Sequence, residues 1–212
     1  MPGEKFDAET RRRQILDTTL TIALRDRLEG VSIRTVAREA GVSMGLVSFY
    51  FGSKDGLLLA LLDEVIARIY TYGFETPDPT AAPMERLLPI VRNTVHLIAT
   101  RTSDIQLLLD FWLRARQDNA IRERLQLGLA MFRTEATRIA EDLIADDPAR
   151  FDGITAEALA NVTMSVIDGA MFQAVLFPGS LDENTFMQAI RAVVQADAPI
   201  TRVTLRNDTP TS

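Results

Sequence analysis

The chain has 212 residues, of which 47% are apolar and 25% charged, with a formal net charge of -6. This composition fits one or two compact domains with a sizeable core and excludes a wholly disordered chain. The absence of cysteine excludes disulfide scaffolds, thiolate zinc sites and cysteine nucleophiles. The chain has a single histidine, His96, which excludes a metal site built from several histidines. We therefore expect no metal, no cofactor and no enzymatic activity, since paired carboxylates on one helix are also missing.

The distribution of charge and hydropathy limits where the protein acts. No run of about 18 apolar residues is present, and the polar N-terminus lacks the apolar stretch of a signal peptide. We expect a cytoplasmic protein. Residues 1–55 carry a net charge of +1 and residues 56–212 a net charge of -7. The first segment is thus free of the acidic excess that would repel nucleic acid.

Apolar residues recur at helical spacing along nearly the whole chain, and no convincing alternating strand is found. The sequence predicts an all-α fold of about nine helices, over residues 8–27, 32–40, 43–51, 53–74, 84–100, 103–117, 119–145, 155–177 and 181–196. Expected N-caps are Ser32, Ser43, Ser53 and Thr155. Capping boxes are expected at Ser103-x-x-Gln106 and Ser180-x-x-Glu183. A proline-containing linker occupies residues 76–83, and residues 199–212 are expected to form a flexible tail.

The most informative segment is residues 32–51, which has the spacing of a helix-turn-helix. Ala37 supplies the small residue where two short helices cross, and Gly41 supplies the positive φ angle that the tight turn needs. An apolar residue, Val47, follows six positions later. The second helix carries no acid, offers hydroxyl groups to phosphates, and would be presented to the major groove of DNA.

The motif from Val42 to Leu58 resembles the TetR family of bacterial repressors, because Ser43-x-Gly45 is followed by Tyr50-Phe51-Gly52-Ser53-Lys54-Asp55-Gly56. The resemblance implies a DNA-binding domain over residues 1–55 and a ligand-binding and dimerisation domain over residues 56–198. It also implies roles for single residues. Arg34 and Thr35 would lie near the DNA backbone, Met44, Gly45 and Phe49 would face bases, and Ser43, Ser48, Tyr50 and Lys54 would grip phosphates.

The second half of the chain is similar to the betaine/choline-type (BetI-like) subgroup at Asp110-Phe111-Trp112 and Ile167-Asp168-Gly169. Aromatic rings beside an acid are how quaternary ammonium groups are held. The resemblance thus implies a small cationic or amphipathic effector, with Asp168 or Asp110 facing the cation. The predicted ligand-binding residues are Phe111, Trp112, Phe132, Asp168, Met171 and Phe172. Two alternatives stay open: a plain hydrophobic pocket for a drug or lipid, or aromatic residues that serve only as core.

The helix at 155–177 is apolar nearly all round, so we expect a second subunit to cover it together with the helix at 181–196. The predicted dimer-interface residues are Val162, Val166, Ala170 and Ile190. The resulting hypothesis is a ligand-responsive homodimeric repressor on a palindromic operator in double-stranded DNA. A hypothesis from another class is an all-α small-molecule-binding protein that does not bind DNA. The run Arg11-Arg12-Arg13 either reaches DNA or forms a solvated face.

Overall fold

The computed structural model describes residues 2–73, 78 and 80–194. Within these residues the chain forms nine α-helices and no strand, which confirms the predicted fold class. Residues 74–77 and 79 of the predicted linker, and the whole predicted tail at 199–212, lie outside the described residues. The helices are α1 (Pro2–Gly30), α2 (Ile33–Ala40), α3 (Met44–Phe51), α4 (Lys54–Gly73), α5 (Pro83–Thr100), α6 (Thr102–Arg114), α7 (Asn119–Asp146), α8 (Ala156–Leu176) and α9 (Glu183–Val194).

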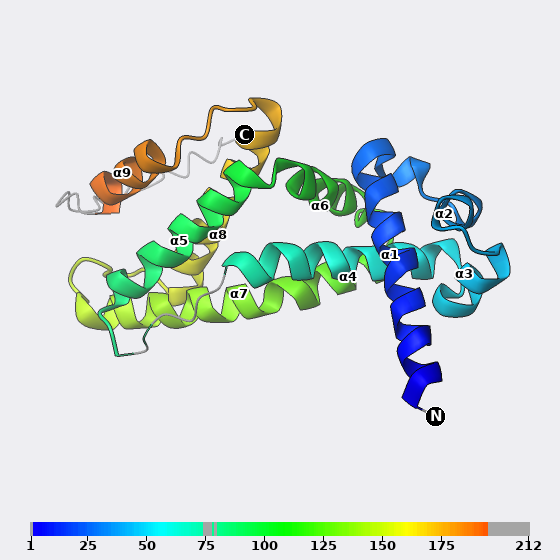
Figure 1. Ribbon diagram of the computed structural model, residues 1–212. Coiled ribbons are helices and arrows are strands. Elements are labelled where there is room, and N and C mark those ends of the chain that lie inside the picture. The colour runs from blue at the N-terminus through cyan, green and yellow to red at the C-terminus, as the bar shows by residue number, and fades with distance from the viewer. Residues whose placement is uncertain (1, 74–77, 79, 195–212) are drawn as a thin grey trace, which may run out of the picture.

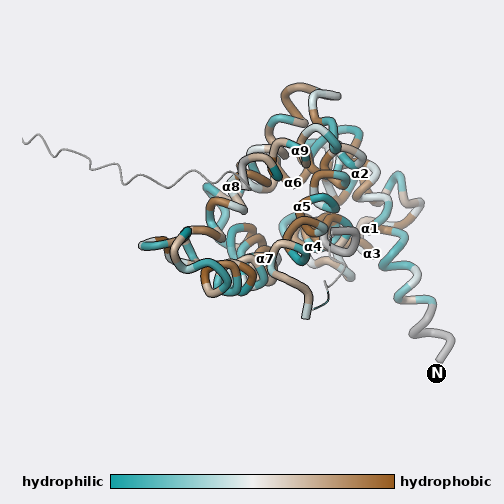
Figure 2. The backbone as a smooth tube through the Cα atoms, turned by 90° about the vertical axis from the view of Figure 1, so that its left-hand side faces the viewer, coloured by the Kyte–Doolittle hydropathy of each residue, from teal (hydrophilic) through white to brown (hydrophobic). Residues whose placement is uncertain are grey.

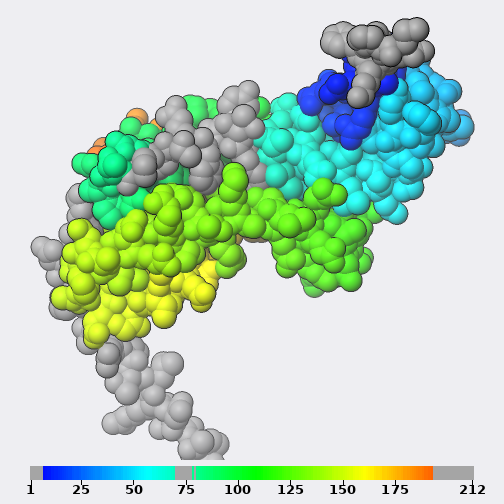
Figure 3. Space-filling model, turned by 90° about the horizontal axis from the view of Figure 1, so that it is seen from below, coloured from blue at the N-terminus to red at the C-terminus, as the bar shows by residue number. Residues whose placement is uncertain are grey.

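The first three helices pack together at one end of an elongated molecule (Figures 1 and 3). Ile15, Ile22 and Val36 are fully buried there, and Val47 joins them from α3. Helix α4 leaves this end and runs into the rest of the molecule, where it contacts α5, α6 and α7. Helix α6 contacts α1 as well as α4 and α8, so it touches both parts of the chain.

The remaining helices form the larger part of the molecule, in which α8 packs against α7, α5 and α6. Apolar and polar residues alternate along the helices, which is typical of amphipathic helices that pack along one face (Figure 2). A small separate apolar cluster of Val91, Val95 and Met187 joins α5 to α9. This arrangement leaves α9 at the edge of the fold (Figure 1).

Helix starts agree with the predicted caps where a lone serine or threonine precedes the helix. The side chains of Ser32, Ser43 and Thr155 accept backbone N–H groups three residues on, and Ser53 accepts the N–H of Gly56.

Both predicted capping boxes are wrong. Helix α6 starts after Arg101 with no side-chain cap, which leaves Ser103 inside the helix. The cap before α9 is Asp182, whose carboxylate accepts the Thr185 N–H, and such a charged acceptor binds more strongly than the Ser180 hydroxyl.

One face of helix α8 lies open in the single chain, and this is the helix that the sequence predicts a second subunit to cover. Val162 is 60% exposed, Phe172 46% and Leu176 67%. Among the described residues α8 is, on its own, the one helix long and apolar enough to cross a membrane. It packs against three neighbouring helices, and an exposed apolar face of this kind is typical of a protein-interaction surface.

Candidate functional site

The turn between α2 and α3 has the geometry that the sequence predicts. Gly41 has φ of 66° and ψ of 32°, a left-handed conformation that glycine adopts without steric cost. The N–H of Val42 donates to the carbonyl of Ala37 at 2.9 Å. Ala37 is buried where the two helices cross, which lets their backbones approach. These contacts fix α3 at a defined angle to α2, as a helix-turn-helix requires.

The outer face of α3 carries most of the predicted DNA-binding residues. Phe49 is 79% exposed and Met44 is 55% exposed, unusually high values for large apolar side chains. Tyr50 is half-buried, and its ring lies edge-on to Phe49 with 5.3 Å between the ring centroids. The other predicted contacts that are exposed in this domain are Arg34, Ser43, Gly45, Ser48 and Lys54. Thr35 differs, because it is half-buried and its hydroxyl lies 2.8 Å from that of Ser32.

The arginines of α1 are engaged within the chain. Arg13 makes two hydrogen bonds to Glu64 on α4, at 2.7 and 2.8 Å. The guanidinium of Arg12 lies over the ring of Phe51, 5.2 Å from its centroid. Arg11 donates to Gln14 at 2.9 Å. Arg12 and Arg13 therefore contribute to packing between α1, α3 and α4, a role that neither alternative from the sequence includes.

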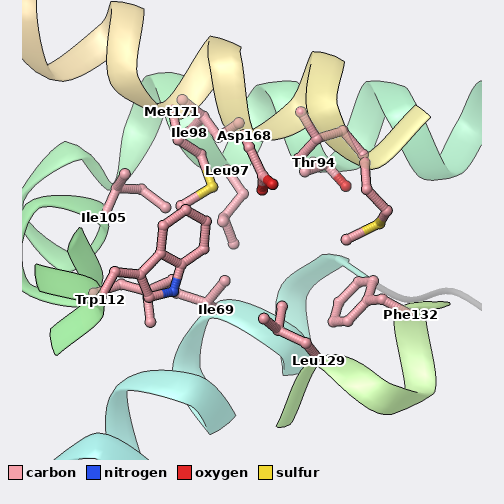
Figure 4. A pocket seen from close by; sticks show the side chains of 13 residues that line it. Ile69, Thr94, Leu97, Ile98, Ile105, Trp112, Leu129, Phe132, Asp168 and Met171 are labelled. Atoms are coloured by element: carbon pink, nitrogen blue, oxygen red, sulfur yellow. The ribbon is translucent and has the colours of Figure 1, made fainter. Parts of the chain in front are cut away.

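A small cavity of about 50 Å³ lies between α4, α5, α6, α7 and α8. Its wall is almost entirely apolar, and Trp112 and Phe132 face each other across it (Figure 4). Asp168 projects its carboxylate from α8 into the space between the two rings. An apolar cavity of about 150 Å³ is enough to bind benzene. A cavity of this size must therefore enlarge before it can hold an organic effector.

Two polar groups of this pocket have no partner among the described residues. Asp168 is half-buried and makes no hydrogen bond or ion pair there, and burial raises the pKa of its carboxyl while the charge of Arg133 acts in the opposite direction. The indole N–H of Trp112 is buried without an acceptor. Buried polar groups normally have partners, so both groups favour a ligand that supplies them.

The structure brings together four of the six predicted ligand-binding residues: Trp112, Phe132, Asp168 and Met171 all line the cavity. Phe111 does not line it, because that side chain points into the hydrophobic core and is fully buried. Phe172 is on the surface side of α8, with its ring 6.3 Å from that of Trp112. The sequence missed the rest of the lining, which comes from α4 and α5 as well as from α6, α7 and α8 and includes Ile69, Thr94, Ile98, Ile105, Leu129 and Met164. Their helical spacing is identical to that of ordinary core residues, so no signal distinguishes them.

Asp110, the second acidic candidate, lies away from the pocket. It faces Arg27 of α1, with 3.8 Å between Nε and the carboxylate oxygen Oδ2. Among the described residues, no group of three or more histidines or carboxylates is placed to hold a metal ion.

The four predicted interface residues separate into two pairs. Val162 and Val166 are exposed on the open face of α8, where Gly169 is also exposed and a Cβ built on it would have no neighbour within 4 Å. Ala170 is buried within the chain, and Ile190 packs against the small cluster between α5 and α9. The first pair is thus exposed in the single chain, Ala170 is not, and Ile190 is partly buried.

An all-α chain with an N-terminal helix-turn-helix and a separate helical pocket has the architecture of a bacterial ligand-responsive transcriptional regulator. Comparison with known families supports this class. Residues 15–61 match the model of the bacterial regulatory proteins of the tetR family, and residues 83–198 match the C-terminal domain of BetI-type transcriptional repressors. The chain belongs to the TetR family of transcriptional regulators and has a BetI-type C-terminal domain. It is a DNA-binding regulator and not an enzyme.

Similar proteins agree with this assignment over most of the chain. The HTH-type transcriptional regulator BetI of Burkholderia ambifaria MC40-6 is 30% identical over 177 residues, which cover 82% of this chain and 87% of that protein. BetI of Vibrio vulnificus YJ016 is 27% identical over 82% of this chain and 85% of its own length. A transcriptional regulator from Pseudomonas aeruginosa PAO1 superimposes with a TM-score of 0.75 at 24% identity, covering 88% and 89% of the two chains. A regulator from Saccharomonospora viridis, solved in complex with choline, gives 0.71 at 20% identity, covering 89% and 97%.

Proposed function

We propose that the protein is a cytoplasmic homodimeric repressor that binds a palindromic operator through α3 and the start of α4. TetR-family regulators bind operators and small-molecule effectors and act as dimers. Two copies of α3 related by a two-fold axis would enter successive major grooves, which are about 34–36 Å apart. The exposed apolar pair Val162 and Val166 supplies the dimer contact.

The DNA-binding assignment is tested by removing one charge. Lys54→Ala takes away an exposed ammonium group at the start of α4, and each protomer of the dimer loses one phosphate contact. The plot of log affinity against log salt concentration should flatten by about 0.9 for each contact, about 1.8 for the dimer. Arg92→Ala, which removes an exposed charge from α5, is the matched control and should leave the slope unchanged. An unchanged slope in the Lys54 variant would remove this residue from the operator contacts.

Base recognition is a separate question from phosphate contact. The exposed ring of Phe49 suits apolar contact with a thymine methyl group in the major groove. Phe49→Ala should therefore alter the base preference at one operator position, measured by binding to a set of singly substituted operators. A uniform loss of affinity across the set would mean that Phe49 contacts the backbone instead.

We propose further that the effector is a small organic cation. The observation that carries this proposal is the unpaired carboxylate of Asp168 between two aromatic rings in an otherwise apolar pocket. A desolvated cation over such rings gains about 2 kcal/mol or more from the ring faces. The choline-bound regulator of the same fold makes choline a suitable first probe.

A thermal-shift screen tests the charge requirement directly. Choline is compared with its neutral isostere, in which a quaternary carbon replaces the nitrogen, and betaine with the corresponding carbon analogue, which lacks the cation and keeps the carboxylate. Choline should raise the melting temperature, and its neutral isostere should not. If only uncharged lipophilic compounds raise it, the second candidate, a plain hydrophobic pocket, is correct; the almost wholly apolar wall is the observation in its favour.

A further inference from the structure

Arg27 has a backbone conformation that is rare for a residue with a side chain. Its φ is 62° and its ψ is -175°, and no other non-glycine residue of the described segments has a positive φ. This region of conformational space is essentially restricted to glycine, and other residues occupy it only when their surroundings hold them there. The last turn of α1 is therefore strained.

The strain has a local consequence for the path of the chain. The kink at Arg27 folds the end of α1 back so tightly that a Cβ on Gly30 would lie 2.4 Å from the Cβ of Asp26. Beyond the kink, Leu28 and Val31 are buried in the core of the DNA-binding domain, directly before α2. A change in the dihedral angles of Arg27 would therefore move the segment that leads into the helix-turn-helix.

The side chain of Arg27 points to α6, which belongs to the other part of the molecule. Its Nε lies 3.8 Å from Oδ2 of Asp110, a buried oxygen that has no hydrogen bond among the described residues. Burial raises the pKa of the Asp110 carboxyl, Arg27 lowers it and Glu29 raises it. The charge of Arg27 thus stabilises this carboxylate, and the attraction ties the strained residue to α6.

Helix α6 also forms one wall of the effector pocket. Ile105, Leu108 and Trp112 line the cavity from a single face of the helix. At about 100° of rotation per residue, Asp110 projects from nearly the opposite face to Trp112. Since the cavity of about 50 Å³ must enlarge to admit an effector, its walls must move, and a movement of α6 would displace Asp110 from Arg27.

We propose that Arg27 and Asp110 form a strained latch: the ion pair holds the end of α1 in its operator-binding conformation, and displacement of α6 opens the pair and lets Arg27 relax. This proposal rests on the proposed repressor function. It makes α6 the element that connects the pocket to the helix-turn-helix. The energy that moves the DNA-binding domain is stored in the backbone of Arg27, and the effector only releases it.

Two variants that both remove the ion pair should give opposite results. Asp110→Asn removes the charge that holds Arg27 in its unfavourable backbone conformation. The end of α1 can then relax, and operator affinity should fall about tenfold. The double variant Arg27→Gly/Asp110→Asn also lacks the pair, but glycine adopts the observed angles without strain. Its operator affinity should return to within about twofold of wild type. Asp63→Asn, which breaks an exposed ion pair with Arg124 between α4 and α7, is the control and should bind like wild type.

Amide hydrogen exchange of residues 24–36 in the DNA-free protein provides a second measurement. Exchange should be faster in Asp110→Asn and return to the wild-type rate in the double variant. Equal operator affinity in Asp110→Asn and wild type, or an equal loss in the single and double variants, would overturn the latch. If the wild-type protein binds no operator, the proposed function fails, and the exchange rates alone then decide whether a strained latch exists.

Discussion

The bidentate ion pair between Arg13 and Glu64 allows a quantitative test of how α1 is fixed to α4. The pair makes two hydrogen bonds at 2.7 and 2.8 Å, and Asp17 adds a third contact to Arg13 at 2.9 Å. The two partners differ in exposure, since 54% of the Arg13 side chain is exposed but only 12% of the Glu64 side chain. Arg13→Ala therefore leaves a mostly buried carboxylate without its cation, whereas Glu64→Gln leaves an exposed cation that still has Asp17.

The expected magnitude follows from this asymmetry. Exposed ion pairs contribute about 0.2–1 kcal/mol, and hydrogen bonds to charged groups about 1.5–3 kcal/mol. For a bidentate pair with one partner in water, we expect a coupling free energy of about 1–2 kcal/mol. Arg13→Ala should cost about 2 kcal/mol of the free energy of unfolding, because the unpaired Glu64 adds a desolvation cost. Glu64→Gln should cost about 1 kcal/mol, and the double variant less than the sum of the two.

Urea unfolding of the four proteins in this double-mutant cycle gives the coupling free energy. Arg11→Ala is the control, since Arg11 makes only a local bond to Gln14, and it should change the free energy of unfolding by less than about 0.5 kcal/mol. Operator affinity provides a second readout: Arg13→Ala should leave the salt dependence of binding unchanged. Equal costs for Arg13→Ala and Arg11→Ala, or a flatter salt slope for Arg13→Ala, would refute a structural role for the pair.

Three other predictions concern the open face of α8 and the pocket. Val166→Glu should give a monomer in size-exclusion chromatography, because an unpaired charge buried in a dimer interface costs several kcal/mol. Gln126→Glu, at an exposed position of α7, should leave the dimer intact, and a folded, dimeric Val166→Glu variant would place the interface elsewhere. Trp112→Ala should abolish the thermal shift with choline and preserve operator binding, and a retained shift would exclude a role for this ring. Burial raises the pKa of the Asp168 carboxyl, so the folded chain holds this proton more tightly than the unfolded chain. The contribution of Asp168 to stability is therefore present below the ordinary carboxyl pKa of about 4 and is lost as the pH rises through the raised value. Asp168→Asn should flatten this part of the stability profile in urea titrations, and an unchanged profile would assign the pH dependence to another carboxyl.

The sequence predicts the helices and the helix-turn-helix well because their signals are local. Ser32, Ser43 and Gly41 act on backbone groups within five residues of themselves, so their spacing alone determines the caps and the turn. The failed capping boxes have the same origin. A serine followed by an acid or amide at the correct spacing does not show which residue the chain places just outside the helix, and for α9 that residue is Asp182.

The pocket is only partly predictable, because its lining comes from five helices that are distant in the sequence. Trp112 and Asp168 attract notice as an indole and a carboxylate in apolar surroundings, and the structure places both at the cavity. Phe111 adjoins Trp112 in the sequence but points about 100° away around α6, into the core. Helical spacing gives relative directions on one helix and leaves open which direction faces a cavity.

Long-range ion pairs and backbone strain cannot be predicted from local sequence patterns. The partner of Arg13 is 51 residues away, and that of Arg27 is on α6. At a kink with positive φ, local preferences favour glycine, yet Gly30 stands three residues after the position that needs it. Conflicts between local preference and global fold in natural proteins occur mainly at functional or strained sites, where a gain elsewhere compensates the cost. The contact with Asp110 is the compensating interaction that the structure shows for Arg27, which is why the comparison of Asp110→Asn with Arg27→Gly/Asp110→Asn separates the effect of strain from that of charge.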